Sequence, residues 1–553
     1  MKRHLPVVLA ALVISSSAAV YPAIAAPCPK LDPVFSRWAG VDTPGFAVAV
    51  VADGHVICEQ AYGKADLATG VAITPDTRFN LASLTKPFLA LAAVDVARGG
   101  ALGLDAPLAR VLPGAAPYYQ SVTTRQMLSH TSGVPDIATL IVLSGHSSAE
   151  PLENGLLRAL IDRQGHLNFP PGDRYLYSNS GYLLTAAILE QATGQSYADL
   201  MADRVFRPAG MVSPRIYAAP GQSVAGAALS YGFDAANQSW RPIVYASAAH
   251  GSSNLYASAD DVARWASYFL KAASHHDPRV AEMTRPAPVK GGTAPYGLGL
   301  EVIEYRGRTL WMHTGSEAGY RTVLLMFPEI NAAVVVLGNA SVRPQPLAEA
   351  VADMMFGDDF PAASPHTAVP PTLAVDPSMA AAFSGFYELE PGRVAQVAYA
   401  DNRVFVAIDP IGMAAFDAIS ERRLLHRGSG VTVTFENPGT DGFETLRLSG
   451  IGAPSVGRRV AVAKTDPTAL GRLAGRYISP ALGATYELGA DEHGLSLTMQ
   501  GQTEPLSLTA LADGKFVSAE AGATIEFVDD TTFLLSTWRV NDIRFARAPQ
   551  EVN

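Results

Sequence analysis

The sequence of 553 residues predicts an α+β domain followed by two small antiparallel β units. Three observations predict this arrangement. From about Leu31 to Gly357, strand-like apolar runs lie near both ends of the segment and helical stretches lie between them. A Pro- and Ala-rich stretch then covers residues 361–377, and short alternating strands follow it. A chain of this length has room for about three or four domains.

Residues 1–25 are predicted to be an export signal. Lys2, Arg3 and His4 form a basic start, an apolar run covers Leu5 to Ile14, and small residues follow at Ala23-Ile24-Ala25. The apolar run is shorter than the ~20 residues that a membrane helix needs. We therefore expect a periplasmic or secreted protein with no membrane span after signal cleavage; an uncleaved N-terminal anchor is the alternative.

Export bears on the two cysteines. Cys28 follows the expected cleavage point and Cys58 lies on an expected strand. In an oxidising compartment the two could pair and hold the mature N-terminus in place. The alternative is one flexible and one buried thiol, and the residues alone do not decide between them.

The domain over residues 27–360 is expected to mix strands and helices. Its expected strands, in chain order, are Phe46–Val51, His55–Tyr62, Thr322–Phe327 and Ala332–Leu337, with turns at Asp53-Gly54 and around Pro328–Asn331. Its expected helices are Leu84–Arg98 ending at Gly99-Gly100, Tyr182–Gln191 ending near Gly194, and Asp260–Leu270 with Ser258 as N-cap.

Residues 361–377 read as a linker, and the units at 378–465 and 466–550 read as small barrels. Phe383-Ser-Gly-Phe-Tyr387 recurs as Leu473-Ala-Gly-Arg-Tyr477, which indicates a duplicated β unit. The strands expected in these units are Arg403–Ile408, Val431–Phe435, Thr445–Leu448, Leu495–Met499 and Phe533–Thr537.

The composition excludes several function classes. Asp and Glu number 51 against 41 Lys and Arg, a net charge of −10, which argues against a nucleic-acid partner. Two cysteines are too few for a Cys-rich metal module, and His275-His276 has no further ligands at metal spacing. Neither a phosphate loop nor a dinucleotide fingerprint occurs in the sequence, so we expect no metal and no cofactor.

Ser83-Leu-Thr-Lys86 is the sharpest chemical motif. A serine and a lysine three apart share one helix face, and the first turn of a helix favours developing negative charge. Pro87 fits such a first turn. A serine hydroxyl needs help to become a nucleophile, and Lys86 could supply a cation or, when desolvated, a base. As a bare tetrapeptide, however, the motif is common and is typical of a solvated helix face.

Two further motifs change this interpretation. Tyr177-Ser-Asn179 follows a Pro-Pro-Gly loop and precedes a helix, so a phenol and an amide could face one cleft. His313-Thr-Gly315 precedes the expected strand pair, where glycine would let a substrate backbone approach. Taken singly, these could be a buried tyrosine with a capping asparagine and a histidine before a tight turn.

In this order and spacing, the three motifs resemble those of the serine β-lactamase and penicillin-binding protein superfamily, in its class C β-lactamase-like branch. The flanking text Phe79-Asn-Leu-Ala-Ser83, Met127-Leu-Ser-His-Thr-Ser-Gly133 and Tyr296-Gly-Leu-Gly299 is similar too. The resemblance covers about residues 31–357. It implies an antiparallel sheet flanked by helices, a helical subdomain, and a site in the cleft between them.

The resemblance also implies roles. Ser83 matches the acylated nucleophile, Lys86 the proton-relay lysine and Tyr177 the general base and acid partner; which of the last two takes the first proton stays open. Asn179 would orient the substrate amide. His313 and Gly315 match the strand beside the substrate, and the N–H of Ser316 would join that of Ser83 in an oxyanion hole.

One departure from the resemblance concerns the substrate. β-Lactamases of this superfamily usually have lysine where this chain has His313, and a histidine is largely neutral at pH 7. His-x-Gly occurs in esterase-like and D-aminopeptidase-like relatives, and D-aminopeptidases also resemble this chain in having two β-barrel units, from which a loop can shape the pocket. We expect an exported serine hydrolase of the D-aminopeptidase or D-Ala-D-Ala carboxypeptidase type, acting on a small or peptide substrate, possibly derived from the cell wall.

The alternatives are an esterase and, with less support, a β-lactamase or a non-catalytic penicillin-binding sensor. Three further residues near the motifs receive mainly structural interpretations. His130 is expected to be structural, Arg321 either faces substrate or pairs with a carboxylate, and His250 opens a loop that could line the cleft. The oligomeric state cannot be read from the residues.

Overall fold

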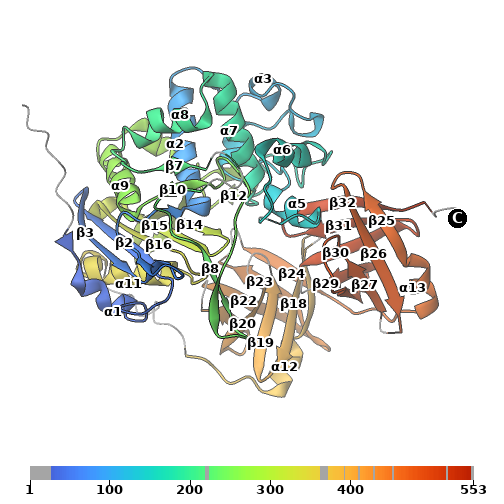
Figure 1. Ribbon diagram of the computed structural model, residues 1–553. Helices are drawn as coiled ribbons and strands as arrows, with labels where there is room; N and C mark the ends of the chain where they lie inside the picture. Colours follow the sequence, from blue (N-terminus) through green and yellow to red (C-terminus); the bar gives the residue numbers. More distant parts are fainter. Residues whose placement is uncertain are drawn as a thin grey trace, which may run out of the picture.

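The computed structural model describes residues 26–549 except 148, 218, 220–222, 362–370, 391–392, 409–411, 428–429, 451–453, 493 and 519–520. The expected signal peptide therefore lies outside the described residues, and so does most of the expected linker. Figure 1 shows an N-terminal α+β domain and two β-barrels beside it. No helix in the described part of the chain has the length and apolar character needed to cross a bilayer.

The centre of the N-terminal domain is a sheet with the strand order β1-β3-β2-β16-β15-β14-β13. All neighbours are antiparallel except β1 and β3. The strands are β1 (Ala26–Pro27), β2 (Phe46–Ala52), β3 (His55–Tyr62), β13 (Glu301–Tyr305), β14 (Arg308–Glu317), β15 (Tyr320–Phe327) and β16 (Ala332–Gly338). The turn between β2 and β3 requires left-handed backbone, with φ +50° at Asp53 and +73° at Gly54, as the Asp-Gly pair predicts.

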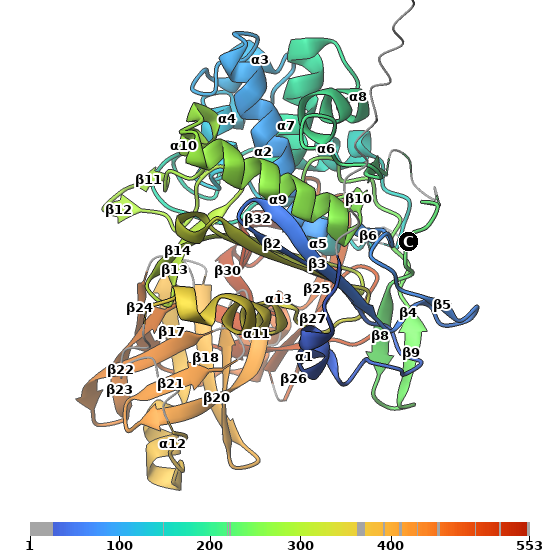
Figure 2. The ribbon, with the colours of Figure 1, turned by 90° about the vertical axis from the view of Figure 1, so that its left-hand side faces the viewer.

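Both faces of this sheet are covered, which makes its central strands apolar throughout. Ala47, Ala49 and Val51 of β2 belong to the hydrophobic core on the side of α9 (Ala259–Ser274). The alternate residues Val48 and Val50 belong to the core on the side of α11 (Gln345–Phe356). Figure 2 shows α9 and α11 on opposite sides of the sheet.

The helical subdomain is built around two long helices, α2 (Lys86–Arg98) and α7 (Asn179–Thr193). As predicted, helix α7 ends at Gly194 and α9 has Ser258 as its N-cap. Gly194 is left-handed, and Ser258 forms a capping box with Asp261. The shorter helices are α1 (Asp32–Phe35), α3 (Leu108–Val111), α4 (Thr124–Leu128), α5 (Ile137–Leu143), α6 (Asn154–Asp162), α8 (Tyr197–Met201) and α10 (Pro278–Met283).

Small two- and three-stranded sheets complete the domain. They comprise β4 (Lys64–Asp66), β5 (Val71–Ala72), β6 (Phe79–Asn80), β7 (Arg215–Ile216), β8 (Tyr231–Asp234), β9 (Ser239–Pro242), β10 (Leu255–Ala257), β11 (Pro288–Val289) and β12 (Gly292–Thr293). Strand β6 pairs with β10 immediately before the Ser83 turn and thereby fixes the start of that turn.

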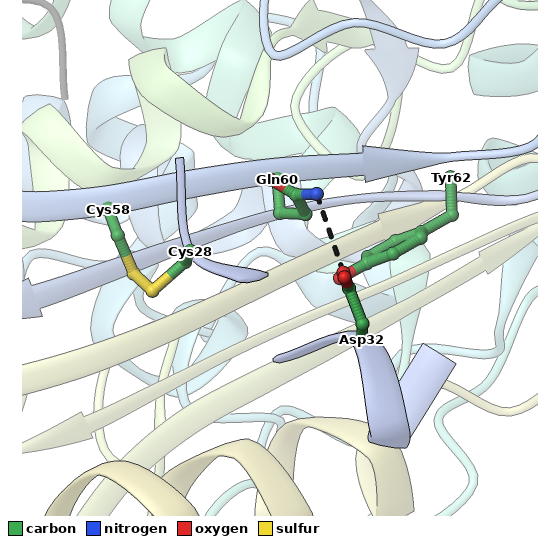
Figure 3. The surroundings of a disulfide bond; sticks show 5 residues. All are labelled: Cys28, Asp32, Cys58, Gln60 and Tyr62. Atoms are coloured by element: carbon green, nitrogen blue, oxygen red, sulfur yellow. Dashed lines mark hydrogen bonds between the residues drawn. A yellow bond between two sulfur atoms is a disulfide. The ribbon is translucent and has the colours of Figure 1, made fainter. Parts of the chain in front are cut away.

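The two cysteines form a disulfide, so the pairing alternative holds. Cys28 and Cys58 have Cα atoms 5.4 Å apart and join the N-terminal segment to β3 (Figure 3). Nearby, the Asp32 carboxylate at the start of α1 accepts a hydrogen bond of 2.9 Å from the Tyr62 hydroxyl. The start of the described chain is thus tied to the sheet by the disulfide, by the pairing of β1 with β3 and by hydrogen bonds to Asp32.

Each C-terminal unit is a closed antiparallel barrel of eight strands in the described residues. The first consists of β17 (Gly385–Glu390), β18 (Arg393–Ala400), β19 (Arg403–Ile408), β20 (Gly412–Ser420), β21 (Arg423–His426), β22 (Val431–Gly439), β23 (Gly442–Ser449) and β24 (Ser455–Val460). The second consists of β25 (Gly475–Ser479), β26 (Ala484–Asp491), β27 (Gly494–Thr498), β28 (Leu506–Ala510), β29 (Lys515–Ser518), β30 (Ala523–Asp529), β31 (Thr532–Thr537) and β32 (Val540–Arg547). Closure removes the exposed sheet edges that would invite aggregation.

The short sequence repeat marks the entry to each barrel. Helices α12 (Pro377–Phe383) and α13 (Pro467–Leu473) end directly before the first strand of their barrels. In each barrel the repeated tyrosine bonds back to the end of its helix: Tyr387 to the carbonyl of Phe383 at 3.0 Å, and Tyr477 to that of Leu473 at 2.8 Å. The repeat is therefore a structural lock that the two units share.

Candidate active site

The nucleophile candidate Ser83 lies in a tight turn, not in the first turn of the long helix where we expected it. A 3₁₀ turn covers Ala82–Thr85 and α2 begins only at Lys86. The turn is strained at Ala82, with φ +51°, and the Asn80 side-chain oxygen holds it by accepting the Ala82 N–H at 2.8 Å. Ser83 lines a cavity beyond this turn.

Lys86 is fully buried and directed at Ser83. Its Nζ donates to Ser83 Oγ at 3.0 Å, to Asn179 Oδ1 at 2.8 Å and to the Ser252 carbonyl at 2.9 Å. Burial lowers the pKa of Lys86 to about 7, an effect that the Asp136 carboxylate opposes and the Arg539 charge reinforces. A lysine with this pKa is partly neutral near pH 7 and can accept the proton of the serine hydroxyl.

Tyr177 lies above this pair. Lys86 Nζ is 4.9 Å from the centre of its ring, and the ring of His130 packs against it with centroids 4.1 Å apart. Burial raises the pKa of the Tyr177 phenol, whereas the hydrogen bond to Ser83 and the charge of Arg539 lower it. The phenol is therefore placed to exchange protons with the same hydroxyl.

Asn179 connects the lysine to a buried carboxylate. Its side-chain oxygen accepts from Lys86, while its amide nitrogen donates to Asp136 Oδ1 at 2.9 Å. Asp136 is fully buried and caps α5, accepting from the Thr139 N–H at 3.2 Å. The Asp136 carboxylate thus orients the Asn179 amide so that its oxygen points toward Lys86.

The His313-Thr-Gly315 motif lies within β14, ahead of the strand pair β15 and β16, as expected. Strand β13 pairs with β14 only as far as Met312, so in the described residues the edge from His313 to Glu317 has no partner strand on that side. A Cβ on Gly315 would lie 2.2 Å from the Leu81 carbonyl oxygen. Glycine is therefore required here for β14 to pass close to the Ser83 turn.

His313 is buried and neutral. Its Nδ1 donates to the Thr314 carbonyl at 2.6 Å, and its Nε2 accepts from the Tyr296 hydroxyl at 2.8 Å. Burial, with a smaller contribution from the Lys86 charge, lowers the pKa of His313 to about 3. The histidine therefore supplies no positive charge at neutral pH.

A cavity of about 1050 Å³ opens over these groups and is walled by all three domains. Ser83, Tyr177, Asn179, His313 and Ser316 line it, together with Leu389, Val456 and other residues of the first barrel. The second barrel contributes Arg539 from the turn between β31 and β32. Figure 1 shows this hairpin beside α5.

Two carboxyl groups also line the cavity and were not anticipated. Glu301 begins β13 and Glu317 ends β14. Burial raises the pKa of each to about 7, and Lys86 and Arg321 oppose that rise at Glu317. These acids add negative charge to a cavity that Arg174, Lys290, Arg393 and Arg539 also line.

The secondary candidates have structural surroundings. His130 Nδ1 accepts the Ser178 N–H at 3.1 Å, which holds the loop that carries Tyr177. His250 stacks on Tyr197 and does not line the cavity. Arg321 donates to the carbonyls of Ala318 and Tyr320, and its charge acts on Glu317.

Asp136 and Arg539 are two further residues that sequence reasoning missed. Asp136 follows the quoted Met127–Gly133 text and precedes an apolar run, so a helix-cap signal was present but gave no reason to join it to Asn179. Arg539 lies in an ordinary turn more than 350 residues from Tyr177, where nothing local marks it.

The sheet, the helical subdomain and the serine–lysine pair beneath them define a protein of the β-lactamase and transpeptidase fold class. Residues 34–354 match the family model described as Beta-lactamase, and because this is more than half of the chain, the chain belongs to that family. The names of its curated relatives support a hydrolase.

The chain is 27% identical over 406 residues to penicillin-binding protein 4* of Bacillus subtilis, covering 69% of this chain and 88% of the relative. It is 32% identical over 280 residues to a D-aminopeptidase of Brucella anthropi, covering 50% of this chain and 52% of the relative. The chain thus spans about half the length of that D-aminopeptidase.

Solved structures support the fold. An octameric penicillin-binding protein homologue from Pyrococcus abyssi has a TM-score of 0.53 at 21% identity, covering 75% of this chain and 96% of its own. SurE has a TM-score of 0.52 at 23% identity, covering 78% and 98%. At these identities the likeness concerns the fold alone.

Proposed function

We propose that this protein is an exported serine hydrolase that forms an acyl-enzyme on Ser83 and releases N-terminal D-amino acids from peptides or amides. The observation that carries the proposal is the 3.0 Å hydrogen bond between Ser83 Oγ and a buried Lys86 whose pKa is about 7. This pairing joins a nucleophile to a base that is available at neutral pH. The D-aminopeptidase relative supports the choice of substrate.

The proposed reaction uses the groups already placed. Neutral Lys86 takes the Ser83 proton as Oγ attacks the substrate carbonyl carbon, and the N–H groups of Ser83 and Ser316 receive the oxyanion. Collapse breaks the C–N bond, and the leaving amine takes a proton delivered through Tyr177. Water then attacks the Ser83 ester while the lysine–tyrosine pair takes one of its protons, and that proton passes to Ser83 Oγ as the acyl C–O bond breaks.

Two carboxyl groups of the cavity favour a substrate with a free amine. His313 is neutral and supplies no cation for a substrate carboxylate, whereas Glu301 and Glu317 present carboxyl groups that complement an ammonium. These two acids favour an aminopeptidase, and the cationic lining residues Arg174, Lys290, Arg393 and Arg539 make a carboxypeptidase the alternative. Export is supported by the residues of the 1–25 segment and by the Cys28–Cys58 disulfide, which suits an oxidising compartment.

The nucleophile is tested by Ser83→Ala, which should abolish turnover of D-Ala-p-nitroanilide while the melting temperature stays unchanged. Intact mass after incubation with substrate should show an acyl adduct in the wild type and none in the variant. Unchanged turnover would refute the assignment. Faster cleavage of short acyl p-nitrophenyl esters than of D-Ala-p-nitroanilide would favour the esterase alternative, which His-x-Gly also permits.

The amine subsite is tested with Glu317→Gln. We expect KM for D-Ala-p-nitroanilide to rise about tenfold, because a charge-assisted hydrogen bond is worth ~1.5–3 kcal/mol. KM for the N-acetyl derivative should not change. The exposed Glu304 on β13 provides the matched control, Glu304→Gln, which should leave both values unaltered.

The same subsite has a pH signature with a defined sign. Glu317 has a pKa of about 7, so it becomes an anion as pH rises through 7. A substrate α-ammonium loses its charge near a pKa of ~7.7–8.0. Wild-type KM for the free-amine substrate should therefore be lowest between these values, and Glu317→Gln should make this minimum shallower, since Glu301 remains.

A further inference from the structure

The turn between β31 and β32 is fastened to the N-terminal domain at its backbone. The carbonyl of Arg539 accepts the Asp136 N–H at 3.2 Å and the Asn168 side-chain amide at 2.8 Å. The Asn541 N–H donates to Asn168 Oδ1 at 2.9 Å, and the Asn541 carbonyl lies 2.9 Å from His166 Nε2. The hairpin is thus held on both sides of Arg539.

The side chain of Arg539 reaches the groups that surround Ser83. Its Nη1 lies 3.6 Å from Asp136 Oδ2, and its Cζ lies 5.0 Å from the centre of the Tyr177 ring. Lys86 Nζ lies 4.9 Å from the centre of the same ring. Two cations from different domains therefore flank one phenol.

A continuous set of polar contacts runs from this arginine to the nucleophile. Arg539 faces one oxygen of Asp136, and the other oxygen accepts from Asn179 at 2.9 Å. Asn179 in turn accepts from Lys86 at 2.8 Å, and Lys86 donates to Ser83 at 3.0 Å. Each side chain in this series of contacts is therefore oriented by the next one.

We propose that Arg539 is a positioning residue through which the second barrel orients Tyr177 and the Asp136–Asn179–Lys86 chain for attack by Ser83. The inference rests on the proposed function and extends it, because it places a required group outside the family-matched residues 34–354. The second barrel is then part of the reaction site and not an appended module.

The expected pH effect has the same sign whichever residue is the base. The charged groups facing Lys86 and Tyr177 are Asp136, Arg539, Glu317 and Glu301. The other titratable groups there are His130, His313, Tyr175, Tyr182 and Tyr296, and burial raises the pKa values of these three phenols. Both histidines have pKa values lowered by burial and stay neutral. Arg539 lowers the pKa of both Lys86 and Tyr177. Removing it raises both pKa values, so the ascending limb of the pH–rate profile moves to higher pH.

The test measures acylation of Ser83 by p-nitrophenyl acetate in the full-length protein, followed by intact mass. This small ester needs only the nucleophile and its activating groups, so substrate recognition does not enter. Arg539→Ala should slow acylation about 10- to 100-fold, the range expected when reacting groups are misplaced by ~1 Å. The ascending limb of its pH–rate profile should move to higher pH. Arg539→Lys should restore the wild-type position of this limb and part of the acylation rate.

Arg544 on β32 provides the matched control because its side chain is exposed and does not line the cavity. Arg544→Ala should acylate at the wild-type rate. Acylation by Arg539→Ala at the wild-type rate and pH dependence would overturn the inference and leave the proposed function intact. Absence of Ser83 acylation in the wild type would instead refute the proposed function. If Arg539→Ala does not fold, Arg539→Gln serves in its place, and the same outcomes apply.

Discussion

The two barrels share one closing device but relate differently to the N-terminal domain. In each, an arginine of the last strand bonds to the repeated tyrosine: Arg459 to Tyr387 at 2.6 Å and Arg547 to Tyr477 at 2.9 Å. In each, the preceding helix is capped by aspartate before proline. The closure of the barrel has thus stayed the same in both units.

Their cores differ. The buried residues of the second barrel form one continuous hydrophobic cluster with the helical subdomain, whereas the first barrel has a cluster of its own. The Tyr486 hydroxyl of the second barrel also donates to the Leu143 carbonyl of α5 at 2.7 Å. Two copies of one unit have therefore diverged at the docking face: the first lines the cavity wall, and the second reaches the reacting groups.

The largest effect should come from breaking the two closures separately. Each arginine donates to several backbone carbonyls, and hydrogen bonds from charged groups are worth ~1.5–3 kcal/mol each. Arg459→Ala and Arg547→Ala should each lower the free energy of unfolding of the affected unit by about 3 kcal/mol. Only Arg547→Ala should also lower kcat, because its strand β32 carries the Arg539 turn.

Thermal unfolding and kcat at a temperature below both transitions would check this pair. Arg→Lys at each position is the control, since lysine keeps the charge and loses the planar fork. An equal loss of kcat in both alanine variants would contradict the proposed division of labour between the barrels.

The shared features were accessible to sequence reasoning, and the divergent ones were not. The five-residue repeat predicted two β units because it encodes a local lock between a helix end and the first strand. Strand Arg403–Ile408 was predicted with its observed bounds, since alternation is local too. The docking of the second barrel depends on contacts such as Tyr486 with Leu143, which no local pattern records.

A smaller effect is expected from loosening the docked hairpin. The Asn168 side chain holds it through two hydrogen bonds, to the Arg539 carbonyl and from the Asn541 N–H. Asn168→Ala should lower kcat for D-Ala-p-nitroanilide about tenfold, equivalent to ~1.4 kcal/mol, with little change in KM. Asn168→Asp keeps one acceptor oxygen, so its kcat should lie between that of the wild type and that of Asn168→Ala. A change confined to KM would place the hairpin in substrate binding instead.

The residues of the site also divide into those that local sequence marks and those that it does not. Ser83, Lys86, Tyr177, Asn179 and His313 were found because each belongs to a short motif, and the structure brings them around one cavity. The surroundings that set their chemistry come from elsewhere in the chain: Asp136, Arg539, Glu301 and Glu317. Burial by the whole fold, which gives Lys86 a pKa of about 7, has no signature in the motif.

The first barrel should act on specificity alone. Val456 on β24 is 42% exposed and lines the cavity. Val456→Ala removes two methyl groups at ~0.8 kcal/mol per buried carbon, of which only part is buried. We expect KM for D-Phe-p-nitroanilide to rise about threefold, with kcat and the D-Ala substrate unaffected. An effect on kcat with the small substrate would show that the first barrel also reaches the reacting groups.

The smallest effect concerns the contact between the barrels. Lys515 of the second barrel pairs with Glu388 of the first at 2.6 Å, next to an apolar contact of Phe386, Leu511 and Val517. Partly exposed ion pairs contribute ~0.2–1 kcal/mol, and Lys515 keeps a second partner in Asp513. Glu388→Gln should therefore lower the free energy of unfolding by about 0.5 kcal/mol. In about 0.5 M salt the loss should be smaller, because salt screens the attraction between the two charges. Loss of more than ~2 kcal/mol would mean that this pair, rather than the apolar contact beside it, fixes the first barrel against the second.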